Sequence, residues 1–209
     1  MGLAYTKTTW VDDVTGLSAA RLNNLEAGVY AQACPIVTSL PASPQDGQEC
    51  QYVADAANGV LWHLVYRAAD TSSYKWNCVG GPGLVSLNNA QGTLTTPYNT
   101  AQDIATLGPI AVTVPLAGVY DLEASSFAMN GSASGNGMRF SASIGGVLDA
   151  AGGNLASVPA GNGTYFPISG GGRFTVAAGG VVKIMFSSFS NLVGDFGYPR
   201  IRVTPVRVG

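Results

Sequence analysis

The segment CQYVADAANGVLWHLVYRAADTSSYKWNC, residues 50–78, decides the fold class because apolar and polar residues alternate along it. Asn58-Gly59 separates its first two runs, and this dipeptide favours a tight hairpin turn since both residues tolerate positive φ. Three runs alternate, and the residues expected to share one face are Cys50, Tyr52 and Ala54, then Val60, Trp62, Leu64 and Tyr66, then Tyr74, Trp76 and Cys78. The segment predicts a three-stranded antiparallel meander with one aromatic face.

The opposite face of this meander is predicted to be polar and to carry Gln51, His63, Arg67 and Lys75. A sheet this small needs its aromatic face covered, and the nearest cover is a helix predicted over residues 17–32. Together these features predict a small β module that depends on the segment before it.

The helix over residues 17–32, LSAARLNNLEAGVYAQ, begins at Ser18 as N-cap and places Leu22, Leu25 and Val29 on one apolar stripe. A helix of about 16 residues is marginal alone in water, so we expect the stripe to pack on the meander or on other copies of the chain. It is too short for a convincing coiled coil. Trp10, in an extended arm, is predicted to staple the helix entry or to dock onto a larger body.

The Gly80-Gly81-Pro82-Gly83 segment predicts a hinge, because no regular element continues through it. We therefore expect an arm and helix over residues 1–33, a β module over 34–83 and a further domain over 84–209. The strand pattern of that last domain predicts a β-sandwich or jelly roll. Its short strands, separated by glycine-rich turns, are expected at 110–114, 118–129, 138–144, 164–168, 173–176, 181–186 and 200–206.

The composition restricts the partners. Only 11% of the 209 residues are charged, against about 25% in a typical soluble domain, which fits a surface partly hidden in an assembly. The net charge of −2 argues against a nucleic-acid partner, and neither a membrane span nor a signal peptide is predicted. We expect no nucleic-acid partner, no membrane insertion and synthesis in a cytoplasm.

The sequence has an odd number of cysteines, and none of them forms a CxxC pair; the three are Cys34, Cys50 and Cys78. His63 is the sole histidine. This spacing does not match a zinc site, so the sequence predicts buried free thiols, no metal and no cofactor.

The sequence predicts no catalytic constellation. It has no GxSxG, and a Ser-His-Asp arrangement would have to use His63. Asp121 and Glu123 lie two apart on one predicted strand, where exposed positions are expected rather than a catalytic pair. Residues 170–172, Gly-Gly-Gly, are predicted to be a turn and not a phosphate cradle, since no Lys-Ser/Thr follows.

Two stretches resemble known proteins. WVDDVTGLSAARLNNLEAGV, residues 10–29, resembles a segment near the N-terminus of phage tail-fibre and virion-fibre proteins. The segment that follows resembles a small module of the same proteins. The matching features are LPASP at 40–44, DGQE at 46–49, a strand with Trp62, and YKW and VGGP at 74–82. The last domain is similar in outline to the tumour-necrosis-factor-like jelly rolls that end many trimeric fibres. The segments that carry this resemblance are AGVYDLEAS, VVKIMFSS and PRIRVTPVRV.

The resemblance implies a non-enzymatic virion protein that forms a homotrimer, attaches by its N-terminal region to capsid or tail proteins, and projects its last domain toward a host-surface glycan. Predicted loops at 130–137, 145–163 and 187–198 would carry the ligand-binding aromatic residues Tyr165, Phe166, Phe196 and Tyr198. These aromatics could instead fill the core or a trimer interface. A capsid-decorating head-fibre protein without a receptor, and a polysaccharide-degrading enzyme, remain as alternatives.

Overall fold

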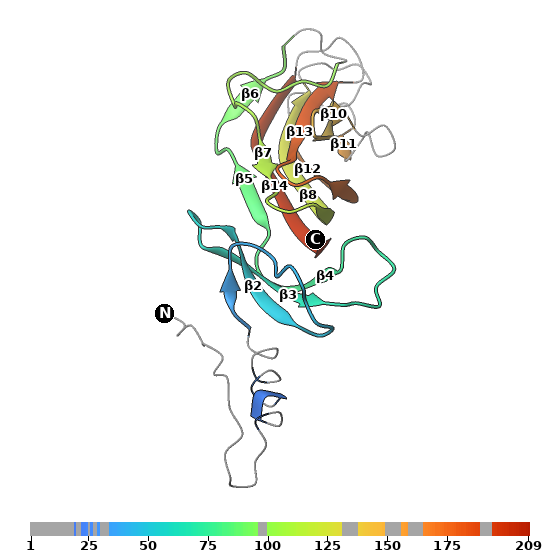
Figure 1. The fold of residues 1–209 in the computed structure, drawn as a ribbon. Helices are drawn as coiled ribbons and strands as arrows, with labels where there is room; N and C mark the ends of the chain where they lie inside the picture. Colours follow the sequence, from blue (N-terminus) through green and yellow to red (C-terminus); the bar gives the residue numbers. More distant parts are fainter. Residues whose placement is uncertain are drawn as a thin grey trace. The chain divides into compact units, whose positions relative to one another are not determined.

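The computed structural model describes residues 19, 22–24, 26, 29, 34–95, 100–130, 138–148, 156–158, 165–188 and 194–209. The chain is mainly β and divides into two compact units, Met1–Pro82 with Arg207–Gly209, and Gly83–Val206 (Figure 1). The division lies within the Gly-Gly-Pro-Gly segment noted above, whereas the inclusion of Arg207–Gly209 in the first unit has no signal in the sequence. The three-part division at residues 33 and 83 stays a prediction.

The helix expected over residues 17–32 is present at all six of its positions that the structure describes, 19, 22–24, 26 and 29. Leu22 is half-buried, whereas the side chain of Val29 is 57% exposed. Leu25 and Trp10 lie outside the described residues. No helix in the described part of the chain is long and apolar enough to cross a membrane.

The sheet of the first unit contains β1 (Ile36–Val37), β2 (Glu49–Asp55), β3 (Val60–Tyr66) and β4 (Trp76–Gly80). The β2–β3–β4 meander is antiparallel, which confirms the prediction, and β1 adds to β2 in parallel. The last residues of β14 (Gly194–Val208) pair with β4. One face of the meander is buried, and its fully or nearly buried side chains are Cys50, Tyr52, Trp62, Leu64 and Trp76.

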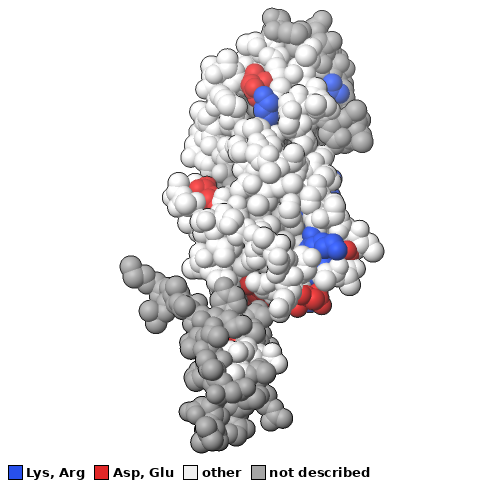
Figure 2. Space-filling model, in the orientation of Figure 1, with Lys and Arg blue, Asp and Glu red and all other residues white. Residues whose placement is uncertain are grey.

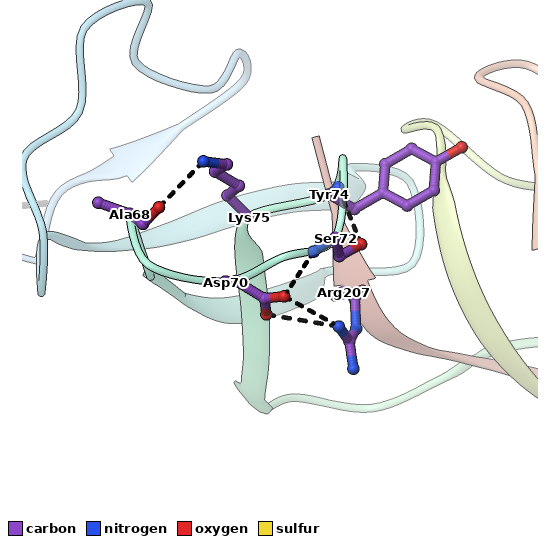
Figure 3. Close-up of polar contacts among 6 residues, drawn as sticks. All are labelled: Ala68, Asp70, Ser72, Tyr74, Lys75 and Arg207. Carbon is purple, nitrogen blue, oxygen red and sulfur yellow. Dashed lines mark hydrogen bonds and ion pairs between the residues drawn. The ribbon is translucent and has the colours of Figure 1, made fainter.

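Asp70 fixes the loop between β3 and β4 (Figure 3). Its carboxylate accepts a hydrogen bond of 2.9 Å from the Ser72 backbone N–H and one of 3.2 Å from the Arg207 guanidinium. Ser72 in turn accepts from the Tyr74 N–H, and Lys75 donates to the Ala68 carbonyl. The Asp70 side chain is only 15% exposed, so this ion pair is more protected from water than an ordinary surface pair.

The second unit is a β-sandwich, as the sequence predicts. One sheet contains β8 (Gly118–Asn130) between β12 (Tyr165–Val176) and β14, with β5 (Leu84–Leu87) and β6 (Gln91–Thr93) paired to β14. The other sheet has the order β10 (Val147–Leu148), β9 (Met138–Ile144), β13 (Val181–Ser188) and β7 (Ala111–Thr113), with β11 (Ala156–Val158) on β9.

The core of the sandwich lies between these sheets. Phe186 of β13 and Phe196 of β14 are almost completely buried, and their ring centroids are 4.6 Å apart. The alternate residues of both sheets surround them, and the buried set includes Leu122, Ala124, Ala128, Phe140, Ala142, Val182, Ile184, Ile201 and Val203. The spacing of two along each strand therefore decides which side chains remain outside.

Three sequence-based predictions in this unit are wrong. Residues 170–172 are not a turn but the middle of β12, which pairs with β8 without interruption. A Cβ at Gly171 would collide with the Leu122 carbonyl oxygen, so glycine here permits close strand pairing. The predicted loop 187–198 contains Ser187 and Ser188 of β13 and the start of β14, and the predicted loop 145–163 contains β10 and β11.

We expect Asp70→Ala to lower the free energy of unfolding of the first unit by about 1–3 kcal/mol, because the hydrogen bonds of this carboxylate with Ser72 and Arg207 are lost. The measurement is the urea midpoint followed by tryptophan fluorescence. Trp62 and Trp76 are buried in this unit and report on it, and residues 83–206 of the second unit contain no tryptophan.

The matched control is Arg67→Ala, which removes an exposed cation next to the same loop. It should leave the midpoint unchanged, and an Asp70→Ala midpoint equal to that of the control would contradict the role given to this carboxylate.

Candidate functional site

A groove of about 410 Å³ lies on the outer face of the β12–β8–β14 sheet. All three strands contribute, and the lining residues are Glu123, Ala124 and Ser125 of β8, Ser169, Gly170 and Gly171 of β12, and Arg200 and Arg202 of β14. It belongs entirely to the second unit.

Strand alternation and register assemble this groove. Gly171 pairs with Glu123, and Ser169 pairs with Ser125, so these residues lie side by side across β8 and β12. On β14, the intervening Ile201 is fully buried in the core, which directs Arg200 and Arg202 to the outer face. The groove is therefore a direct consequence of how the core is packed.

The floor of the groove consists of small residues. Gly170 and Gly171 have no side chains, so a ligand can approach the strand backbone there. Ser125 and Ser169 each offer a hydroxyl that can donate and accept hydrogen bonds. A shallow floor with hydroxyl groups suits a polar, flat ligand better than a hydrophobic one.

The charges at the groove are only partly compensated. The Arg202 guanidinium lies 3.7 Å from the Glu123 carboxylate, a loose pair between exposed groups. Arg200 makes no ion pair with any residue in the described part of the chain. On the face drawn in Figure 2, charged atoms form small separate groups and no broad field of one sign. Any attraction of this groove for an anion therefore comes from Arg200 and Arg202, the two cations that line it.

Asp121 and Arg173 lie on the same outer face, beyond the groove, and neutralise each other. Arg173 donates two hydrogen bonds to the Asp121 carboxylate, at 2.7 and 2.9 Å. These hydrogen bonds hold the pKa of Asp121 below its usual value. A carboxylate kept ionised in this way does not suit the role of general acid.

Two exposed aromatic residues, Phe127 and Tyr198, lie beside the groove, and we call them the aromatic ledge. Their ring centroids are 6.2 Å apart at an interplanar angle of 87°, and the side chains are 43% and 50% exposed. Phe127 is two residues from Ser125, and Tyr198 is two residues from Arg200, a separation of about 7 Å along each strand.

Tyr198 has φ = 51°, and it is the one non-glycine residue with positive φ in the part of the chain that the structure describes. A bulky side chain in this conformation is strained, and such strain is concentrated at functional positions.

The four aromatic residues predicted from the sequence have different positions. Tyr198 belongs to the aromatic ledge, and Tyr165 donates a hydrogen bond of 3.0 Å to Gln91. Burial, and then the charges of Asp195 and Tyr198, raises the pKa of Tyr165. Phe166 is half-buried. Phe196 is fully buried against Phe186, so it fills the core, and its expected role in stacking on a ligand does not fit its position.

Phe127 was not predicted as a site residue. Its signal in the sequence is its place in the alternation Asp121, Glu123, Ser125, Phe127, which puts a large apolar side chain on an otherwise polar face.

The first unit contains a second group of chemically capable residues, Cys34, Glu49 and His63, whose ligating atoms all lie within 4.8 Å of one another. His63 lies on the polar face opposite Gln51, as predicted, and its Nε2 is 2.9 Å from the Glu49 carboxylate. The sequence gives no spacing signal for this group because 15 and 14 residues separate its members, and only the strand register brings them together. All three cysteines are free, but only Cys50 is buried; Cys34 and Cys78 are half-buried, so the prediction of buried thiols is wrong for these two.

Comparison with known proteins finds no matching family model and no matching curated sequence. Among solved structures, the chain is similar to Eiger TNF from S. frugiperda, with 8% identity, a TM-score of 0.40 and coverage of 61% of this chain and 95% of that one. It is also similar to the globular domain of zebrafish complement 1qA, with 14% identity, a TM-score of 0.39 and coverage of 61% and 98%. A family 35 carbohydrate-binding module from Clostridium thermocellum has 16% identity, a TM-score of 0.29 and coverage of 56% and 90%.

Proposed function

We propose that this chain is a non-enzymatic bacteriophage virion protein that is synthesised in the host cytoplasm and forms a homotrimer. It binds an acidic host-surface glycan through the groove of its second unit. The observation that carries the glycan proposal is the position of Arg200 and Arg202 over a floor of serine and glycine, beside the aromatic ledge.

Each part of the groove matches one feature of an acidic sugar. An arginine binds a carboxylate with two parallel hydrogen bonds, which gives direction as well as charge. The Ser125 and Ser169 hydroxyls can exchange hydrogen bonds with sugar hydroxyls. The exposed rings of Phe127 and Tyr198 can cover the apolar face of a neighbouring pyranose ring. A uronic-acid oligosaccharide therefore fits this surface better than a neutral one.

The virion and trimer parts of the proposal are supported by sequence features and by exposed apolar surface. Residues 10–84 resemble phage fibre segments, and few residues are charged. Val29 of the helix and Val85 and Leu87 of β5 are exposed in the single chain, as expected for surfaces that other copies or virion proteins cover. A capsid-decorating head-fibre protein is the second candidate, since low charge and an N-terminal arm suit it equally well.

We expect Arg200→Ala to weaken binding of a uronic-acid oligosaccharide by about tenfold or more, because a charge-assisted hydrogen bond contributes about 1.5–3 kcal/mol. Tyr198→Ala should also weaken binding through the loss of stacking. The measurement is isothermal titration calorimetry at low and high salt, with a neutral glucan as the ligand control.

The matched control variant is Arg173→Ala, which removes the same charge from the same face but outside the groove. Equal losses from Arg173→Ala and Arg200→Ala would show that general charge, and not the groove, attracts the ligand.

For the assembly, native light scattering should give three times the 21.4 kDa mass of the chain, and a monomer mass at micromolar concentration would contradict the trimer.

An adhesin should compete with phage for host cells. A decorating protein should not compete, but its removal should destabilise the capsid. Release of reducing ends from host polysaccharide would indicate an enzyme and overturn this proposal.

A further inference from the structure

Cys34, Glu49 and His63 meet on the polar face of the first unit through the register of three strands. Ile36 of β1 pairs with Gln51 of β2, so the parallel register places Cys34, two residues earlier, next to Glu49. His63 of β3 pairs with Gln51 and is therefore diagonal to Glu49 on the same face. The three side chains come from different strands or strand ends but point to one place.

We propose that Cys34, Glu49 and His63 form a binding site for one Zn²⁺ ion, with a water molecule as the fourth ligand. Thiolate sulfur, imidazole nitrogen and carboxylate oxygen are the three ligand types that zinc takes in proteins.

The distances agree with this assignment. Zinc bonds of about 2.0–2.3 Å in a tetrahedron separate neighbouring ligand atoms by about 3.3–3.8 Å. In the structure, Nε2 of His63 and the Glu49 carboxylate oxygen are 2.9 Å apart, and the whole set lies within 4.8 Å. The closest pair of ligand atoms must therefore move slightly apart, and the more distant atoms must move slightly closer. Small side-chain rotations achieve both without movement of the strands.

Exposure and charge agree as well. The side chains of His63 and Glu49 are 40% and 42% exposed, which leaves room for a water ligand and an entry path. Glu49 and the Cys34 thiolate together carry two negative charges, which one divalent cation neutralises.

Zinc binding exchanges one proton for one metal–sulfur bond. The Cys34 thiol loses its proton to solvent, and the sulfur lone pair then forms the bond to zinc. Nε2 of His63 gives up the proton that it donates to Glu49, and Nδ1 takes one up from solvent, so the imidazole binds zinc through the Nε2 lone pair and Glu49 binds through a carboxylate oxygen. The other nearby cysteine, Cys50, is fully buried on the opposite face of the meander and is not a ligand.

The test uses the full-length protein with a non-thiol reductant. Co²⁺ serves as a spectroscopic substitute for zinc, and equilibrium dialysis with Zn²⁺ gives stoichiometry and affinity. We expect one metal ion per chain and a thiolate-to-cobalt charge-transfer band. Cys34→Ser should abolish the band, and Cys34→Ser and His63→Gln should each weaken zinc binding by at least about tenfold, since even the outer partners of metal ligands affect affinity by about 10–100-fold.

Cys78→Ser is the matched control, because Cys78 is a half-buried thiol of the same sheet that donates to the Gly80 carbonyl. It should keep the band and the affinity. Zinc should raise the urea midpoint of tryptophan fluorescence in the wild type and in Cys78→Ser but not in Cys34→Ser.

Absence of metal binding, or a band that survives in Cys34→Ser, would overturn the proposal. If His63→Gln does not fold, Glu49→Gln provides the second ligand test. Unchanged affinity in a folded Glu49→Gln protein would likewise exclude this ligand set.

Discussion

The contact between Phe186 and Phe196 is the interaction on which the second unit depends. It joins the two sheets at a centroid distance of 4.6 Å, with both rings buried. Because side chains alternate along the end of β14, burying Ile201 and Val203 leaves Arg200 and Arg202 on the outer face. The core thus determines the composition of the groove, and a change of register in β14 by one residue would remove both arginines from it.

Alternation explains why much of the fold can be predicted from the sequence. The runs at Cys50 and Trp62 gave the correct meander, and repeated short strands gave the sandwich. The prediction of a turn at 170–172 was wrong because glycine favours turns locally, whereas here it allows close pairing of β12 with β8. Phe196 was wrongly predicted to lie in a ligand-binding loop, because the glycines near it gave no sign that β14 begins there.

The two candidate sites were harder to predict for a different reason. Each depends on strand register, which sequence spacing does not reveal. Glu123 and Gly171 are 48 residues apart, yet they are direct partners. Cys34, Glu49 and His63 have none of the short spacings that identify zinc motifs, and β1, which positions Cys34, has only two residues. The positive φ of Tyr198 also has no sequence signal, because tyrosine normally avoids this conformation.

The central claim is that an acidic sugar occupies the groove between Arg200, Arg202 and the glycine-rich stretch of β12. Backbone amide chemical shifts, measured by NMR on the full-length protein during titration with a uronic-acid oligosaccharide, test it most directly. The account predicts saturable shifts concentrated at Ser125, Ser169, Gly170, Gly171, Arg200 and Arg202. Shifts confined to other surfaces, or none at millimolar ligand, would contradict it.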